Sequence, residues 1–170
     1  MPASQIGHTP GIFWNASRSE HPARLASWRA LDAISRRDKE RYISLYAPDG
    51  VIHDPVGRSS VDPAGSGHRG HASLSKFWDE NVARIGEFNF LVHTSLARDN
   101  QAANSFTMIM QPSDGEMTSL ECIFIYRVDE AGLLLYVGGY WEMPEPQAGD
   151  ATAPTRSPGA QLRSAGQLPA

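Results

Sequence analysis

The chain has little cysteine and no long apolar run, and both absences restrict its class. Cys122 is the only cysteine among 170 residues, so no internal disulfide can form. No cluster of cysteine and histidine has the spacing of a zinc site, and we expect neither a metal nor another cofactor. No apolar segment approaches the ~20 residues that a membrane-spanning helix needs. A reducing compartment suits such a chain, and the expected location is the cytoplasm.

An excess of positive charge is also absent. The chain carries 15 lysine and arginine residues against 19 aspartate and glutamate residues, which gives a net charge of −4, and it has no long basic run. We therefore expect neither a nucleic acid nor an anionic membrane as its partner. Residues 1–20 contain no basic segment followed by an apolar run, so they do not have the form of a signal peptide.

What is present divides into three parts. Residues 1–20 form a polar leader whose apolar positions 12–14 offer a surface for packing on the body or on a partner. Residues 144–170 are rich in proline, alanine and glycine and contain no aromatic residue, so we expect a disordered tail. The body between them, residues 21–143, is long enough for one domain with a substantial core.

Helical patterns come first in the body. Pro22 suits the first turn of a helix in which apolar residues recur at every third position. Asp38 can cap a short second helix that reaches Tyr46 and stops at residues 48–50, and a third helix follows residue 70. The apolar positions of the three helices are Leu25, Trp28, Leu31 and Ile34; Tyr42, Leu45 and Tyr46; and Leu74, Phe77, Trp78 and Val82.

Extended patterns follow a first strand at residues 51–54. Short turn sequences that are typical of hairpins separate four further apolar segments, at residues 87–97, 101–112, 117–128 and 133–143. Helices followed by consecutive antiparallel strands form an α+β pattern. We predict a cone-shaped, curved and mostly antiparallel sheet that wraps on three N-terminal helices and encloses a cavity.

Asp54 stands where the first strand meets a forced turn. Val51 and Ile52 favour a strand, and Pro55 confines Asp54 to extended geometry. A carboxylate at that place is either a turn former or a general base that faces a pocket. Burial against apolar walls would raise its pKa and remove its hydration, as a base for carbon acids requires. We prefer the catalytic interpretation.

Several motifs occur in a fixed order between Arg29 and Glu142. They are residues 45–50 (LYAPDG) after the second helix, residues 54–57 (DPVG) after a strand, Gly70, residues 77–78 (FW) and the four-strand meander. In this order they resemble the ketosteroid isomerase branch of the nuclear transport factor 2-like (SnoaL-like) superfamily. The resemblance implies the cone fold, an apolar substrate and a homodimer that forms through the open face of the sheet.

The resemblance also implies roles for individual residues. In that family the aspartate at the position of Asp54 moves a proton between two carbons of an unsaturated steroid ketone, while a tyrosine and a protonated aspartic acid hold the dienolate oxygen. Trp141 matches an aromatic residue of the steroid cavity, and Trp78 matches a tyrosine that supports the oxyanion tyrosine. The two oxyanion donors fall on Ala30 and Phe124, so other groups would have to replace them.

Alternate positions of adjacent strands can supply an apolar wall around Asp54. The expected substrate-binding residues are Ala30, Trp78, Phe106, Met108, Leu120, Cys122, Phe124 and Trp141, and Met110 is a further wall position.

Five side chains are candidate replacement donors: Tyr42, Tyr46, Tyr126, His93 and the indole of Trp78. Tyr126 shares strand parity with Phe124, and His93 could carry a proton because imidazole titrates near neutral pH. The expected catalytic set is therefore Asp54, Tyr126 and His93. For each donor the alternative is a core or rim residue whose polar tip lies in water.

The loop at residues 57–70 leaves several interpretations open. Its glycines could bring backbone N–H groups near an anion with His68 and Arg69 beside it, it could close over the cavity, or it could be a solvated turn.

Three functions remain open for the chain as a whole. The leading one is an isomerase that acts on a small apolar ketone, steroid or polyketide-like, with Asp54 as base. The alternatives are a lyase, cyclase or epoxide hydrolase in which Asp54 works through water, and a non-catalytic module that binds a small apolar ligand.

Overall fold

The computed structural model describes residues 5–113 and 115–142, which form three α-helices and one seven-stranded sheet. The helices are α1 (Pro22–Ser35), α2 (Lys39–Ser44) and α3 (Gly70–Glu80), and a 3₁₀ helix, η1 (Val82–Arg84), follows α3. The strands are β1 (Ile12–Trp14), β2 (Tyr46–His53), β3 (His68–Arg69), β4 (Ile85–Arg98), β5 (Gln101–Pro112), β6 (Thr118–Val128) and β7 (Leu134–Tyr140).

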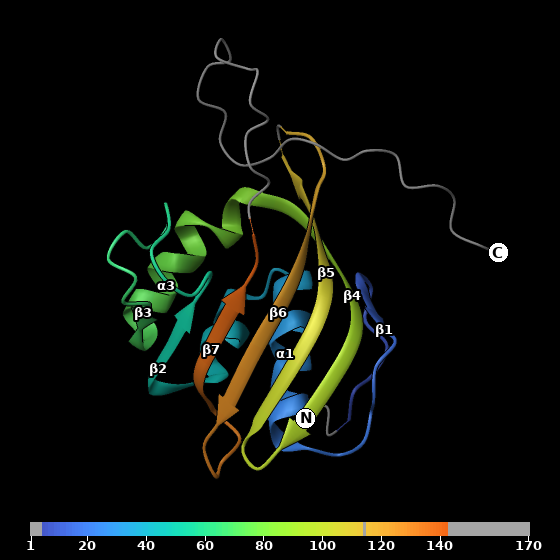
Figure 1. Ribbon diagram of the computed structural model, residues 1–170. Helices are drawn as coiled ribbons and strands as arrows, with labels where there is room; N and C mark the ends of the chain where they lie inside the picture. The colour runs from blue at the N-terminus through green and yellow to red at the C-terminus, as the bar shows by residue number, and fades with distance from the viewer. Residues whose placement is uncertain (1–4, 114, 143–170) are drawn as a thin grey trace, which may run out of the picture.

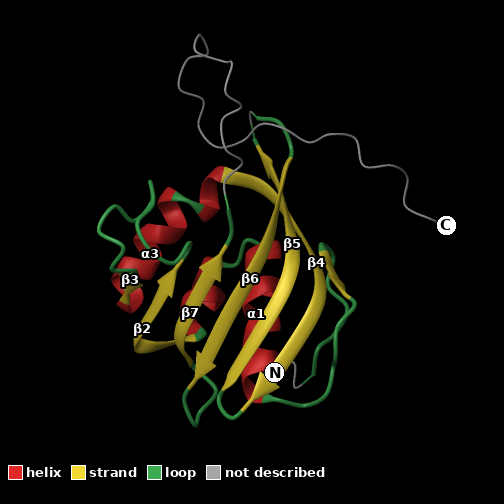
Figure 2. Ribbon diagram, viewed as in Figure 1, coloured by secondary structure: helices red, strands yellow, loops and turns green. Residues whose placement is uncertain are grey.

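The sheet is a long antiparallel meander with added edges. Its order is β1-β4-β5-β6-β7-β2-β3; β1 runs parallel to β4, β2 runs parallel to β7, and the other neighbours are antiparallel. The sheet curves around α1, and the helices gather on one face of it (Figures 1 and 2). This arrangement confirms the predicted α+β cone. No helix in the described part of the chain has the length and apolar character needed to cross a bilayer.

Local signals in the sequence account for the starts of the first two helices. Pro22 occupies the first turn of α1, and the ring of His21 accepts a hydrogen bond from the Ala23 backbone N–H at 3.2 Å. The Asp38 carboxylate caps α2 by accepting the Arg41 N–H at 3.0 Å. Both helix starts agree with the sequence prediction.

The structure differs from the prediction where α2 gives way to β2. The helix ends at Ser44, and Tyr46 already belongs to β2, where it pairs with Leu134 of β7. The register of β2 and β7 shifts between Tyr46 and Val51, so an irregular segment separates the two paired parts of the strand. Tertiary pairing with β7 therefore overrides the helical pattern that the sequence suggested for Tyr46.

The described part of the leader belongs to the domain. Ile12 and Trp14 are buried on the sheet, whereas Phe13 between them is 60% exposed. The leader therefore supplies an edge strand, so residue 21 does not mark the start of the folded body. The expected disordered tail, residues 144–170, lies outside the described residues.

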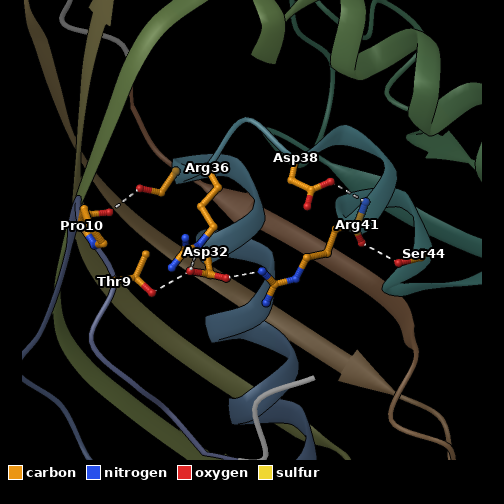
Figure 3. A network of polar contacts seen from close by, with 8 residues as sticks. Thr9, Pro10, Asp32, Arg36, Asp38, Arg41 and Ser44 are labelled. Atoms are coloured by element: carbon orange, nitrogen blue, oxygen red, sulfur yellow. Dashed lines mark hydrogen bonds and ion pairs between the residues drawn. The ribbon is translucent and has the colours of Figure 1, made fainter. Parts of the chain in front are cut away.

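The buried carboxylate of Asp32 links the leader to the first two helices through a hydrogen bond and two ion pairs (Figure 3). Asp32 of α1 is 2% exposed and accepts a 2.6 Å hydrogen bond from the Thr9 hydroxyl. Its carboxylate also forms ion pairs with Arg36 at 2.8 Å and with Arg41 of α2 at 2.6 Å. Although burial opposes ionisation, the bonds from Thr9 and Arg36 and the charge of Arg41 hold the pKa of Asp32 below its usual value.

Candidate active site

A cavity of about 510 Å³ lies between the helices and the concave face of the sheet. This volume is within the range of about 300–1,000 Å³ that is typical of small-molecule sites. Most of the wall is apolar and includes Leu31, Ile52, Phe88, Phe90, Phe106 and Val137. The inward positions of β4, β5 and β6 supply its aromatic part, because alternate residues of a strand face the same side.

Asp54 lies at the cavity wall directly after β2. Since β2 and β7 are parallel, their carboxyl ends meet, and Trp141 directly after β7 comes to lie beside Asp54. The indole Nε1–H of Trp141 donates a hydrogen bond of 2.7 Å to Oδ1 of Asp54. Parallel pairing thus joins two residues that are 87 positions apart in the chain.

Burial raises the pKa of Asp54, and the hydrogen bond from Trp141 partly counteracts this rise. The side chain is neither bonded to its own backbone nor paired with a cation in the described residues. A carboxylate with weak hydration and a raised pKa is a stronger base than one in water. The geometry therefore favours the general-base interpretation of Asp54 over the turn-forming one.

Three tyrosines bring hydroxyl groups into the same cavity. The hydroxyls of Tyr42 and Tyr46 lie 2.8 Å apart and share a hydrogen bond, and Tyr126 lines the wall from β6. Burial raises the pKa of each, and the charge of Asp54 adds to the rise in all three. The hydroxyls are therefore neutral donors close enough to Asp54 to sense its charge.

The Tyr126 hydroxyl is available to a ligand. Tyr126 is only 2% exposed, and none of the other described residues hydrogen-bonds to its hydroxyl. A buried O–H group normally finds a partner, so a polar atom of a bound ligand would complete this one.

Seven of the expected site residues line the cavity together. They are Asp54, Tyr126, Ala30, Phe106, Met108, Phe124 and Trp141. Ala30 and Phe124 contribute apolar surface only, whereas Tyr42 and Tyr46 line the same wall with hydroxyl groups. The cavity therefore has hydroxyl donors, but from other positions than the two that the family resemblance implies.

Three expected substrate-binding residues do not reach the cavity. Trp78 is buried behind Tyr42, with ring centroids 5.1 Å apart, so it supports a site residue. Cys122 pairs with Phe106 on β5, and the rings of Phe106 and Phe124 stack 5.2 Å apart and form the wall there. Leu120 faces the same side of β6 and packs against the core. Tyr42 thus stands at the wall in place of Trp78, and Phe106 and Phe124 do so in place of Cys122.

The structure does not bring His93 together with the other expected catalytic residues, because His93 lies on the convex face of the sheet. Its neighbour Val92 is fully buried, so the pleat of β4 directs the His93 ring outward. There the ring bonds to the Thr107 hydroxyl at 2.8 Å and lies 3.9 Å from the carboxylate of Glu121. The sheet separates it from Asp54.

The loop after Asp54 satisfies its own backbone groups. The carboxylate of Asp62 accepts the N–H groups of Gly65, Ser66 and Gly67 at 3.0, 3.3 and 2.7 Å. These bonds, with that of Gly67 the strongest, lower the pKa of Asp62. The Asp62 carboxylate therefore binds the backbone N–H groups that, from the glycines in the sequence, could have bound an external anion. Residues 59–61 of the loop form part of the cavity wall.

Two features of the site were missed at the level of sequence. Trp141 was expected as an apolar wall residue, and its role as hydrogen-bond donor to Asp54 depends on the pairing of β2 with β7. The Tyr42–Tyr46 pair had a visible signal, because residues four apart on a helix lie on one face. Among the described residues, no group of His, Cys, Asp and Glu side chains is arranged to hold a metal ion.

Comparisons with known proteins agree with this geometry. A family model described as a SnoaL-like domain matches residues 28–137. The steroid Delta-isomerase of Nocardioides simplex is 26% identical in an alignment of 110 residues, and the match covers 56% of this chain and 84% of that protein.

Two solved structures are similar over most of their length. The Delta 5-3-ketosteroid isomerase from Mycobacterium sp. has a TM-score of 0.69 at 28% identity, with 73% of this chain and 95% of that chain covered. RV0760c from Mycobacterium tuberculosis, solved in complex with estradiol-17beta-hemisuccinate, has a TM-score of 0.68 at 28% identity, with 73% and 96% covered.

Proposed function

This chain belongs to the SnoaL-like domain family, and on that premise we propose that it is a ketosteroid isomerase-like enzyme. Asp54 would move a proton between two carbons of a steroid or polyketide-like ketone that is bound in the apolar cavity. The observation that carries this proposal is the Asp54 carboxylate, which has a raised pKa and faces an apolar cavity that also contains neutral tyrosine hydroxyls.

The proton transfer uses the two oxygens of Asp54 differently. Trp141 holds Oδ1, which leaves Oδ2 to accept the proton from the carbon next to the ketone. The C–H bond breaks, an O–H bond forms on Asp54, and the electron pair moves to the ketone oxygen as an enolate. In a β,γ-unsaturated ketone Asp54 then gives a proton, either the one it removed or one exchanged with solvent, to the γ-carbon, so the C=C bond shifts into conjugation and the Asp54 carboxylate is regenerated.

The tyrosines are the donors that hold the enolate oxygen. In the Tyr42–Tyr46 pair one hydroxyl donates to the other, whose own proton can then point into the cavity. Tyr126 offers a second O–H group, and we take it as the main donor because its hydroxyl has no hydrogen-bond partner among the described residues. Preorganised donors in a site that excludes water stabilise developing charge strongly, by about 10²–10³ in rate for one donor.

The test is a turnover screen with Δ5-3-ketosteroids and polyketide-like enones. We expect the native protein to convert at least one of them, Asp54→Asn to lose this activity, and Tyr126→Phe to lower kcat by about 10²-fold. Asp49→Asn is the matched control, because Asp49 is an exposed aspartate of β2, and this variant should keep full activity. Equal rates for native protein and Asp54→Asn would contradict the proposal, and tight binding without turnover would favour a non-catalytic module.

We also propose that two copies pair through the convex face of the sheet. Ile123 of β6 and Tyr140 at the end of β7 are 52% and 49% exposed on neighbouring strands, where they pair in register. Exposed apolar side chains that adjoin on a sheet often mark a protein interface. A homodimer would bury them.

A further inference from the structure

The cavity is polar at its rim. Five polar residues line the cavity there: Ser59, Ser60, Glu80, Asn81 and Arg84. Ser60, Glu80 and Arg84 are exposed, whereas the three tyrosines of the same cavity are at most 2% exposed. The rim therefore meets solvent, and the tyrosines form the closed end.

The closed end and the rim lie toward opposite ends of β5. Tyr126 pairs with Ala102 near the start of β5, whereas Ile85, which follows Arg84, pairs with Pro112 at the last position of the strand. Tyr126 and Arg84 line the same cavity, so a ligand whose ketone contacts Tyr126 and that is long enough to reach the rim directs its other end toward Arg84.

The charges around the rim leave Arg84 without an acidic partner. Glu80 lies 3.8 Å from Lys76, and Asp79 lies 2.7 Å from Lys39, so each acid at the end of α3 has a lysine nearby. Among the described residues no carboxylate pairs with Arg84. Glu87 adjoins the inward-facing Phe88 on β4, so its side chain points away from the cavity.

A second guanidinium supports the same turn. Arg37 donates hydrogen bonds to the backbone oxygens of Ala83, at 2.8 Å, and of Ile85. These bonds fix η1 and the start of β4, and therefore the backbone that carries Arg84. They also bring a second positive charge close to the rim.

We propose that the ligand carries an anionic group, such as a carboxylate, at the end remote from its ketone, and that Arg84 binds this group at the rim. Guanidinium and carboxylate match in a planar, two-bond geometry. The natural substrate class is then an elongated apolar ketone with an acidic tail. This inference rests on the proposed function, since it assumes that the ketone occupies the closed end.

The test compares two ligands that differ only in charge. A 3-ketosteroid 17β-hemisuccinate and its methyl ester are titrated against native protein, Arg84→Gln and the control Arg98→Gln, an exposed arginine at the far end of β4. We expect native protein and Arg98→Gln to prefer the carboxylate by roughly three- to five-fold in Kd, and Arg84→Gln to lose this preference. Added salt should weaken the preference in the native protein, because the pair is exposed.

The outcomes separate this inference from the isomerase proposal. Equal Kd values for the two ligands in the native protein, or an unchanged preference in Arg84→Gln, would overturn the role of Arg84 even if the protein converts ketones. A carboxylate preference that depends on Arg84 in a protein without turnover would support the rim site and refute only the isomerase. If neither ligand binds, the rim site is refuted, whereas the turnover screen with steroid and polyketide-like ketones still decides the isomerase proposal.

Discussion

At the scale of single residues, ionised Asp54 lowers the stability of the fold. Its pKa is raised in the folded state above the value of about 3.9 for an aspartate in an unfolded chain. Between these two pKa values the folded state binds more protons, so the free energy of unfolding falls as the pH rises through this window. The loss of stability persists at neutral pH, where the proposed mechanism needs ionised Asp54 as its base.

Asp54→Asn should therefore melt at a higher temperature than the native protein at pH 7. Each kcal/mol that is gained should raise Tm by about 2–4 °C in a chain of this size. The gain should shrink as the pH falls toward 4, because Asp54 then becomes protonated in the native protein too. Circular dichroism melts at several pH values measure this, with Asp49→Asn as the control. A variant that is less stable at neutral pH would contradict the burial of the charge.

Trp141→Phe should raise the pKa of Asp54 further. The indole hydrogen bond favours the ionised carboxylate, so its loss favours the protonated form. NMR titration of ¹³C-labelled aspartate would show the shift, and the acid limb of the activity profile should move to higher pH. Trp14→Phe is the matched control, since the Trp14 indole bonds to Ser17 elsewhere. An unchanged titration of Asp54 would show that Trp141 does not tune the base.

Two of these residues show what sequence can and cannot predict. The position of Asp54 followed from Val51, Ile52 and Pro55, because a strand and a turn are local. The hydrogen bond from Trp141 could not be predicted, since it depends on which strand neighbours β2. His93 could have been excluded, because the alternation that buries Phe90 and Val92 directs residue 93 outward.

At the scale of elements, one buried carboxylate joins the leader, α1 and α2. Asp32 bonds to Thr9 before β1 and pairs with Arg41, the residue before Tyr42. The network thus fixes the short helix that presents the Tyr42 hydroxyl. Because its pKa is lowered in the folded state, Asp32 adds stability above the unfolded pKa and loses it as the pH falls through the folded value.

Asp32→Asn should lower the free energy of unfolding by about 2–3 kcal/mol at neutral pH, because the buried carboxylate loses its charge-assisted bonds with Thr9 and with the partly exposed Arg36 and Arg41. The difference in free energy of unfolding between this variant and the native protein should become smaller at acid pH. Urea denaturation at neutral and at acid pH measures the difference. Asp79→Asn breaks only the exposed pair with Lys39 and should change the stability by about 1 kcal/mol or less. Equal effects of the two substitutions would contradict the structural role of Asp32.

Element boundaries followed the sequence where local signals set them. Pro22 and Asp38 mark the starts of α1 and α2, and β5 spans residues 101–112 as predicted. The start of β2 did not follow the local helical pattern, because Tyr46 pairs with Leu134 of β7 and so belongs to the sheet. The helical spacing of Tyr42 and Tyr46 nevertheless anticipates that their side chains meet.

At the scale of the whole molecule, the ordered motifs predicted the cone and its cavity, since an apolar inner face on consecutive strands must be covered by the helices. The contents of the cavity depend on which side chains are largest at each level of the sheet. Beside Cys122, the larger side chains of Phe106 and Phe124 stack and form the cavity wall. The sequence alone does not predict this detail.

The exposed apolar side chains on the convex face of the sheet lead us to predict a homodimer. Ile123→Glu should convert a homodimer to a monomer, because it would bury a charge in an apolar contact. Analytical ultracentrifugation measures the mass. Val56→Glu, which adds the same charge outside the strands, should leave the dimer intact. A native protein that is monomeric at high concentration would contradict pairing through this face.

The central claim is that Asp54 removes a proton from carbon, and solvent exchange tests it without any assumption about the product. A 3-ketosteroid is incubated with the protein in D₂O, and NMR follows the signals of the protons next to the ketone. The account predicts rapid deuterium incorporation with native protein and only the background rate with Asp54→Asn. Exchange at the same rate in both proteins, or no exchange in either although the ketone binds, would contradict it.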